Sequence, residues 1–231
     1  RKVGIPSWTT IPVATNTYTI TGLLELTKYE MQVANICSGN PGDFTPLYYF
    51  ITPTIRYCQM SSTNFASEFI SKVTVEPTGQ PTMTNTSLGS NYTDYTSIVA
   101  NFVYAVQGST GNKITINKTV TGTEGTGVAV WIDFNRNGYF DIDERILADG
   151  PNMKTSVTGT FSIPSNAYVS NTDFQYLVMR VALMKGDIPV NCMNFDNGEV
   201  EDYTVRISKQ PIANAIDITE IVIYPNPVKS V

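Results

Sequence analysis

The residues whose types and spacing indicate chemistry lie between positions 133 and 144, where oxygen-bearing side chains alternate around Gly138. Calcium prefers oxygens from carboxylates, amides and backbone carbonyls. The segment fits the spacing of calcium loops at every constrained position, and its glycine permits the sharp turn. The alternative is a metal-free loop built from Asx turns. The predicted Ca²⁺ ligands are Asp133, Asn135, Asn137, Tyr139 through its carbonyl, Asp141 directly or through water, and Glu144 through both carboxylate oxygens.

The segments on either side of this loop do not resemble the helices of an EF-hand. Residues 127–132 are short and rich in β-branched side chains, which predicts a buried strand. Residues 145–147 are too few for a helix and are soon followed by Asp149-Gly150-Pro151. A bound ion would therefore stabilise a connection between two strands. It would not act as a sensor, since there is no helix pair to open.

Composition and charge exclude several classes of function. The chain has 231 residues, no histidine and a formal net charge of −5. The absence of histidine excludes Ser-His-Asp and Cys-His catalysis and most zinc sites. The negative charge argues against nucleic acid or an anionic membrane as a partner. No apolar run approaches the roughly 18 residues that a membrane-spanning helix needs. Any enzymatic activity would have to rest on carboxylates, lysines or tyrosines.

The chain contains three cysteines, Cys37, Cys58 and Cys192, and no C-x-x-C motif. These are too few for a structural zinc site, and the calcium-type loop indicates an oxidising, extracellular setting. One disulfide and one odd cysteine is the expected division, with three buried free thiols as the alternative. Cys58 and Cys192 lie near the two ends of the central segment. A bridge between them would close a long loop and leave Cys37 unpaired within this sequence.

Abundant β-branched and aromatic residues, with Gly or Pro at short intervals, predict an all-β chain. In residues 1–54 we expect strands at 17–21, 29–33 and 47–51. The spacing of Leu23, Thr27 and Tyr29 resembles the tyrosine corner of fibronectin type III domains. The stretch therefore resembles part of such a domain, its second half, and we expect residue 1 to be a truncation point.

Residues 55–208 are predicted to form the main domain, a β-sandwich with a jelly-roll-like arrangement of two sheets. Alternating or apolar runs separated by turn residues mark its strands. The predicted strands are 69–76, 97–106, 113–120, 128–133, 156–163, 174–183 and 200–207.

Residues 198–203 read Gly-Glu-Val-Glu-Asp-Tyr, the string that names the GEVED domain family of secreted Bacteroidetes proteins. The chain resembles this family over about residues 56–208. Other family features occur in order, namely Tyr57-Cys58, residues 91–96, the loop at 131–144, Met179-Arg180-Val181 and Cys192. The resemblance implies a secreted β-sandwich and supports the pairing of Cys58 with Cys192. Asn137 departs from the aspartate usual in the family's loop, which should weaken ion binding.

Residues 209–231 are predicted to contain a linker and then an extended segment interrupted by Pro225 and Pro227. Tyr224-Pro225-Asn226-Pro227 after a hydrophobic run resembles the start of the C-terminal sorting domain of type IX secretion cargo. The resemblance implies the type IX secretion machinery as a partner. The alternative is a Pro-rich linker.

The acidic motif is expected to hold a structural ion pair. On a strand, Glu199 and Glu201 share one face and Asp202 lies on the other. Glu199 and Glu201 would lie at the rim of the core, where a carboxylate needs a cation or hydrogen-bond donors. We expect Arg180 to pair with either Glu201 or Asp202. The alternatives are direct calcium ligation by one of these acids, exposure to solvent, and a catalytic carboxylate pair.

These features predict a non-catalytic, calcium-stabilised module of a larger secreted or cell-surface protein. It would act as a spacer, presentation or adhesion region, with surface glycans or proteins as candidate partners. The alternative is an accessory or carbohydrate-binding part of a secreted peptidase or glycosidase whose catalytic domain lies upstream.

Overall fold

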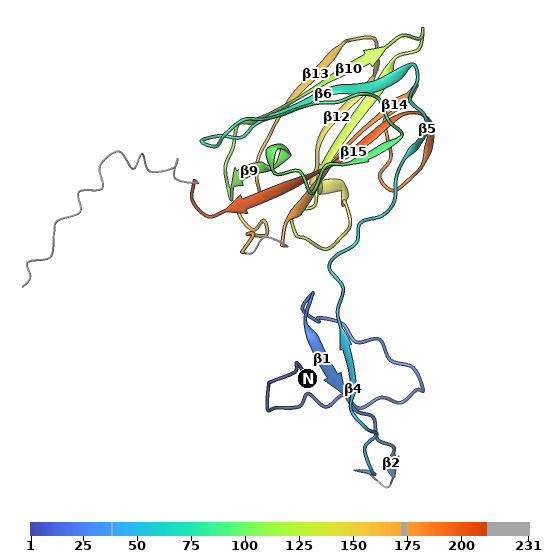
Figure 1. The fold of residues 1–231 in the computed structure, drawn as a ribbon, viewed down its shortest axis with the longest axis vertical. Coiled ribbons are helices and arrows are strands. Elements are labelled where there is room, and N and C mark those ends of the chain that lie inside the picture. The colour runs from blue at the N-terminus through green and yellow to red at the C-terminus, as the bar shows by residue number, and fades with distance from the viewer. Residues whose placement is uncertain (38, 172–174, 212–231) are drawn as a thin grey trace, which may run out of the picture. The chain divides into compact units, whose positions relative to one another are not determined.

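The computed structural model describes residues 1–37, 39–171 and 175–211. The chain divides between Tyr57 and Cys58 into two compact units, close to the boundary expected at residues 54–55. Each unit can be followed by its colour in Figure 1, and each is described by itself. Strands dominate the described residues, which confirms the all-β prediction. No described helix is long and apolar enough to cross a membrane.

The first unit contains two small antiparallel pairs of strands. Strand β1 (Lys28–Met31) pairs with β4 (Tyr48–Ile51), and β2 (Ile36–Cys37) pairs with β3 (Asn40–Pro41). The strand expected at residues 17–21 does not form. The Tyr29 hydroxyl accepts a hydrogen bond from the Leu24 N–H at 2.9 Å, as in a tyrosine corner. No described apolar residue of this unit is buried, and Cys37 is exposed and free.

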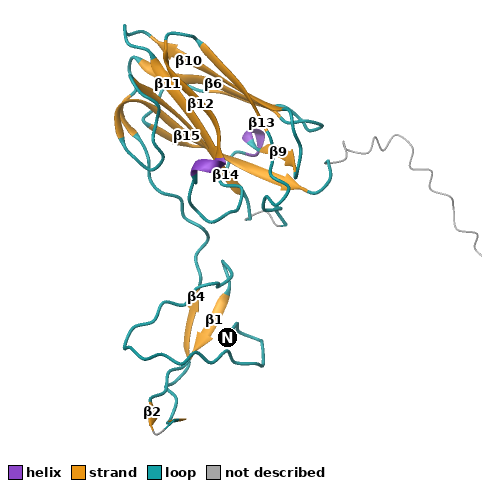
Figure 2. Ribbon diagram, turned by 180° about the vertical axis from the view of Figure 1, so that it is seen from behind, coloured by secondary structure: helices purple, strands orange, loops and turns teal. Residues whose placement is uncertain are grey.

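The second unit is a sandwich of two sheets, shown from opposite sides in Figures 1 and 2. The smaller sheet is antiparallel throughout. Its strands, in spatial order, are β13 (Ser156–Phe161), β10 (Asn112–Val120), β6 (Glu68–Glu76) and β7 (Met83–Thr86).

The larger sheet has a long antiparallel part that ends at β15 (Phe195–Ser208). The strands before β15, in spatial order, are β12 (Arg145–Asn152), β11 (Thr126–Ile132) and β14 (Leu177–Lys185). Three short strands then pair in parallel with β15, namely β5 (Ser62–Asn64), β8 (Tyr92–Asp94) and β9 (Val103–Val106). The described helices are two 3-10 turns, η1 (Val99–Asn101) and η2 (Ile142–Glu144).

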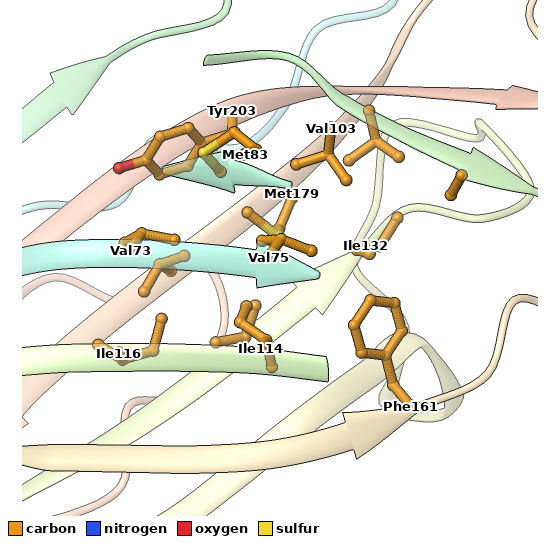
Figure 3. Close-up of a cluster of buried hydrophobic side chains, with 14 of the residues drawn as sticks. Val73, Val75, Met83, Val103, Ile114, Ile116, Ile132, Phe161, Met179 and Tyr203 are labelled. Atoms are coloured by element: carbon orange, nitrogen blue, oxygen red, sulfur yellow. The ribbon is translucent and has the colours of Figure 1, made fainter. Parts of the chain in front are cut away.

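The hydrophobic core lies between the two sheets (Figure 3). Successive side chains of a strand point to opposite faces, so alternate residues of the smaller sheet enter the core. Val73 and Val75 of β6 and Ile114 and Ile116 of β10 are fully buried and follow this rule. Strand β11 is buried along its whole length, Trp131 included, so both of its faces are covered. This buried strand leads directly into the loop that begins at residue 133.

Candidate metal-binding loop

The loop at residues 133–144 leaves the end of β11 and returns through η2 into β12. Asp133 is 0% exposed and Glu144 is 4% exposed, so the two acidic ends of the loop are both buried. Phe134 is also buried and belongs to the core between the sheets, which anchors the start of the loop. Gly138 has a φ of 86°, a left-handed conformation that glycine adopts without a steric penalty.

The first half of the loop is curled by its own side-chain oxygens. Asp133 accepts a hydrogen bond at Oδ1 from the Asn137 N–H (3.1 Å) and at Oδ2 from the Gly138 N–H (2.9 Å). The Asn135 Oδ1 also accepts from the Asn137 N–H, at 2.9 Å. The Asn137 Oδ1 in turn accepts from the Tyr139 N–H at 2.8 Å. Asn135 and Asn137 thus form two consecutive Asx turns on the exposed side of the loop, and Asp133 accepts from the loop backbone at both carboxylate oxygens.

Glu144 closes the loop from its other end. Its Oε1 accepts from the Asn135 N–H at 3.2 Å, and its Oε2 accepts from the Asp141 N–H at 3.0 Å. The second of these bonds belongs to the capping box of η2, in which the Asp141 side chain accepts from the Glu144 N–H. The Asn137 amide also donates to the Asp141 Oδ2 at 3.1 Å. The predicted ligand side chains thus form one connected network.

The chemistry of these donors fits calcium. Burial raises the pKa of the Glu144 carboxyl, and the charges of Asp133 and Asp141 act in the same direction, against two backbone N–H groups. A divalent cation would relieve this crowding of negative charge. Among the described residues no group of three or more Asp, Glu, Cys or His side chains is placed to hold a metal ion. The donor set of the loop is instead mixed, with carboxylate, amide and carbonyl oxygens, as calcium prefers.

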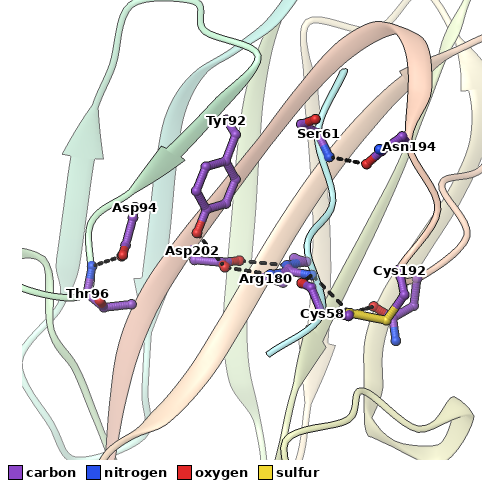
Figure 4. Close-up of polar contacts among 10 residues, drawn as sticks. Cys58, Ser61, Tyr92, Asp94, Thr96, Arg180, Cys192, Asn194 and Asp202 are labelled. Atoms are coloured by element: carbon purple, nitrogen blue, oxygen red, sulfur yellow. Dashed lines mark hydrogen bonds and ion pairs between the residues drawn. A yellow bond between two sulfur atoms is a disulfide. The ribbon is translucent and has the colours of Figure 1, made fainter. Parts of the chain in front are cut away.

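A buried ion pair lies next to this loop (Figure 4). Arg180 of β14 stands opposite Asp202 of β15 in the strand register. Its Nε is 2.8 Å from Asp202 Oδ1 and its Nη2 is 2.7 Å from Asp202 Oδ2, so the two groups bind side by side. The Tyr92 hydroxyl donates to the same carboxylate at 3.0 Å. Of the two partners expected for Arg180, the structure selects Asp202.

The guanidinium of Arg180 connects the ion pair to the loop and to the disulfide. Its Nη1 donates to the Cys58 carbonyl at 2.8 Å, and its central carbon lies 4.9 Å from the centre of the Phe140 ring. Cys58 and Cys192 form the expected disulfide. The amide of Asn191, next to Cys192, donates to the Phe140 carbonyl at 2.8 Å. Ion pair, disulfide and loop are therefore one contact network on the face of the larger sheet that points away from the core.

Glu201 and Glu199 are not at the rim of the core, where they were expected, but fully buried between the sheets. Glu201 faces away from Arg180 and accepts a 2.7 Å hydrogen bond from the Tyr203 hydroxyl. Burial raises the pKa of Glu201 to about 7, although this hydrogen bond opposes the shift. The expectation failed because the row of β15 side chains that faces the core does not end with its apolar residues. It continues through Glu201 to Glu199.

Glu199 has a structural role that the sequence did not reveal. Its Oε2 accepts from the Ile70 N–H at 2.7 Å, and its Oε1 accepts from both the N–H and the hydroxyl of Ser90, at 2.8 and 2.7 Å. The carboxylate thereby joins β15 to β6 of the opposite sheet. Burial raises the pKa of Glu199 against these three hydrogen bonds. The carboxylate thus has a structural role, since it accepts hydrogen bonds from buried donors across the sandwich. Both of its oxygens are occupied by these bonds, which argues against a catalytic role.

A comparison of the sequence with models of protein families finds a match in this part of the chain. Residues 127–206 match the model of the GEVED domain. The match includes the loop, the Arg180–Asp202 pair and the buried acids, and it is compatible with a non-catalytic module. No curated protein matches the chain. The Tyr224-Pro225-Asn226-Pro227 segment lies outside the described residues.

Proposed function

We propose that the chain is a non-catalytic, calcium-stabilised extracellular part of a larger secreted or cell-surface protein. In this proposal the second unit is a rigid module that presents, spaces or attaches other parts of the protein outside the cell. The first unit is the end of a fibronectin type III-like domain, and the C-terminal segment is the start of a type IX sorting domain. Surface glycans or proteins are the proposed binding partners.

The observation that carries the proposal is the loop closed around Asp133 and Glu144. Two buried carboxylates lie at its ends, amide oxygens lie between them, and backbone N–H groups of the loop fix all of these oxygens in place. Each of these oxygens has a second lone pair, so accepting one hydrogen bond leaves it able to bind a cation. The loop connects two strands of a sandwich, so an ion there would add stability and not movement.

Two further features support a structural role outside the cell. The Cys58–Cys192 disulfide closes a long stretch of chain, and such bonds persist in oxidising compartments. The Tyr29–Leu24 hydrogen bond supports the fibronectin-like assignment of the first unit. The assignment of the sorting segment rests on its sequence, Tyr224-Pro225-Asn226-Pro227.

Thermal unfolding with and without calcium tests the proposal. The protein, first dialysed against a chelator, is melted with no metal, with millimolar Ca²⁺ and with millimolar Mg²⁺. At a calcium concentration about 100-fold above Kd, binding stabilises the folded state by about 2.7 kcal/mol, which raises Tm by roughly 5–10 °C. We expect this shift with Ca²⁺ and a smaller one with Mg²⁺, which binds poorly to flexible oxygen cages.

The variant Asp133→Asn with Glu144→Gln should lose the calcium-dependent shift, because it removes both buried charges and keeps the side-chain shapes. Asp143→Asn is the matched control, since it removes a charge from the same loop at an exposed position outside the ligand pattern. It should keep the shift. An unchanged Tm of the wild-type protein in Ca²⁺ would refute the calcium site. Calcium-dependent hydrolysis of glycans or peptides by the wild-type protein, lost in the double variant, would refute the non-catalytic assignment.

A further inference from the structure

A lysine occupies a core position of the smaller sheet. In β10 the inward row runs from Ile114 through Ile116 to Lys118, which is only 3% exposed. The pairing of β10 with β6 shifts register between Asn117 and Lys118, and such bulges redirect a side chain. A buried ammonium group is costly unless it is paired with a charge or fully hydrogen-bonded. The surroundings of Lys118 therefore require an explanation.

Its amino group is surrounded by amide oxygens. The Lys118 Nζ lies 2.7 Å from the Thr126 carbonyl and 3.2 Å from both the carbonyl and the side-chain Oδ1 of Asn152. Among the described residues, no carboxylate is within ion-pair distance of this nitrogen. Burial lowers the pKa of Lys118, although the nearby Asp149 opposes this. Burial thus makes the neutral amine, which is the nucleophilic form of lysine, more accessible than it is for an exposed lysine.

The side-chain amide of Asn152 is held on all its polar atoms. Its Nδ2 donates to the Asp149 Oδ2 at 2.6 Å and to the Gly150 carbonyl at 2.7 Å. Its Oδ1 accepts from the Lys154 N–H at 3.0 Å, in addition to the Lys118 amino group. The backbone of Asn152 also lies close to that of Gly125, where a Cβ would be 2.5 Å from the Asn152 nitrogen. The Asn152 amide therefore contacts the Lys118 amine through Oδ1 and the Asp149 carboxyl group through Nδ2.

We propose that Lys118 and Asn152 become joined by an intramolecular isopeptide bond. The neutral amine of Lys118 attacks Cγ of Asn152 and forms a C–N bond, and the bond between Cγ and Nδ2 breaks. One amine proton is transferred to the departing nitrogen, which leaves as ammonia. Amine plus carboxamide give a secondary amide plus ammonia, so the reaction requires no oxidant, metal or further reactant.

The neighbouring groups match the steps of this reaction. Asp149 contacts the leaving nitrogen and not the free amine, so it acts on the tetrahedral intermediate, in which both nitrogens are bonded to Cγ. There it takes a proton from the Lys118 nitrogen and delivers one to Nδ2, as a general acid–base. The Lys154 N–H already points at Oδ1, where negative charge develops in the tetrahedral intermediate. The rigid strands hold amine and amide together, which replaces an encounter in solution by an intramolecular step.

The cross-link would have a defined structural effect. Lys118 belongs to β10 of the smaller sheet and Asn152 to β12 of the larger sheet, so the new amide would connect the two layers of the sandwich. Unlike the Cys58–Cys192 bond, it would be insensitive to reductants, and unlike the loop it would not depend on calcium.

Intact mass spectrometry tests the proposal on the whole chain, with the disulfide reduced and alkylated. After prolonged incubation at neutral pH, the wild-type protein should be lighter than its sequence mass by one ammonia. A tryptic digest should contain a branched peptide that joins residues 118 and 152, with no cleavage after Lys118. Asp149→Asn keeps both reacting side chains and should show the full mass. Lys113→Ala, which removes a partly exposed lysine of the same strand, is the control and should remain cross-linked.

Folding of each variant is checked by circular dichroism, and Lys118→Met, which keeps the length of the buried chain, provides a second blocked form. A folded wild-type protein at its full sequence mass, with separate peptides for residues 118 and 152, would overturn the proposal. Cross-linking that persists in Asp149→Asn would overturn the role of Asp149 in the proton transfer. A loss of ammonia located at a residue other than Asn152 would also overturn it.

Discussion

Arg180 and Asp202 face each other across the β14–β15 ladder and are joined by two parallel hydrogen bonds of 2.8 and 2.7 Å. Their side chains are only 2% and 5% exposed, so the pair is formed in a region that water hardly reaches. Such a pair is not in itself a large source of stability, because removing two charges from water is costly. The pair matters because removing only one partner leaves the charge of the other buried and unpaired, which is strongly destabilising.

Arg180→Met should lower the free energy of unfolding by about 3–5 kcal/mol, because it leaves the Asp202 carboxylate buried without its cation. The double variant Arg180→Met with Asp202→Leu should recover part of this loss, since no charge then remains. Urea denaturation of the wild type, both single variants and the double variant measures the coupling. A double variant as unstable as the sum of the two single variants would contradict the prediction.

Replacing both Cys58 and Cys192 by serine should destabilise the second unit strongly. The bond joins positions 134 residues apart, and closing a loop of that length is worth about 4–5 kcal/mol in the chain-entropy model. Guanidinium denaturation without reductant measures the change. Cys37→Ser is the control, because Cys37 is exposed and free. A double variant as stable as this control would show that the bond contributes nothing.

Stability should fall with rising pH because of Glu201. The pKa of this carboxyl is raised by burial from 4.5 to about 7, so between these values the folded protein binds a proton that the unfolded chain has lost. The contribution is therefore fully present below pH 4.5 and is lost by about pH 7, with a total of roughly 3 kcal/mol.

Glu201→Gln removes this titration and keeps the shape of the side chain. Subtracting its denaturation curve from that of the wild type, over pH 4 to 8, isolates the Glu201 term from that of Glu199, whose pKa is raised as well. A wild-type minus variant difference that stays constant over this pH range would contradict the prediction.

The strands with strong apolar patterns could be predicted from the sequence, and those without them could not. Residues 69–76 and 113–120 alternate or are rich in β-branched residues, and they form β6 and β10 almost as expected. Strand β12 was missed because it contains Asp149-Gly150-Pro151, which indicates a turn. As the outer strand of its sheet, it accommodates a proline that a central strand would not.

The loop and the ion pair could be predicted in part because they depend on local spacing or on strand alternation. The burial of the two acids could not be predicted, because a carboxylate is tolerated in a core only where hydrogen-bond donors reach it, and these donors come from residues distant in the sequence. Glu199 finds them at Ile70 and Ser90, far away in sequence. Lys118 does leave a signal, since it continues the inward row of Ile114 and Ile116, but its contact with Asn152 depends on how the sheets stack.

The fold explains why the first residue of the GEVED string, Gly198, is a glycine. Its φ is 137°, and a Cβ there would clash with the Leu183 carbonyl on the neighbouring strand β14. The glycine therefore lets β15 approach β14 at the position where the acidic motif begins. Any other residue would push the two strands apart next to the buried carboxylates.

Strand β15 also determines when the second unit can be completed. Within the described part of the chain, β5, β8 and β9 each pair with β15 and with no other strand. These segments precede it by as many as 133 residues, so they have no place to dock until it is available. In a chain that is synthesised from its N-terminus, these three segments therefore stay unpaired until β15, the last described strand, has been made. A chain cut short before residue 195 would leave those segments unpaired and open to neighbouring molecules.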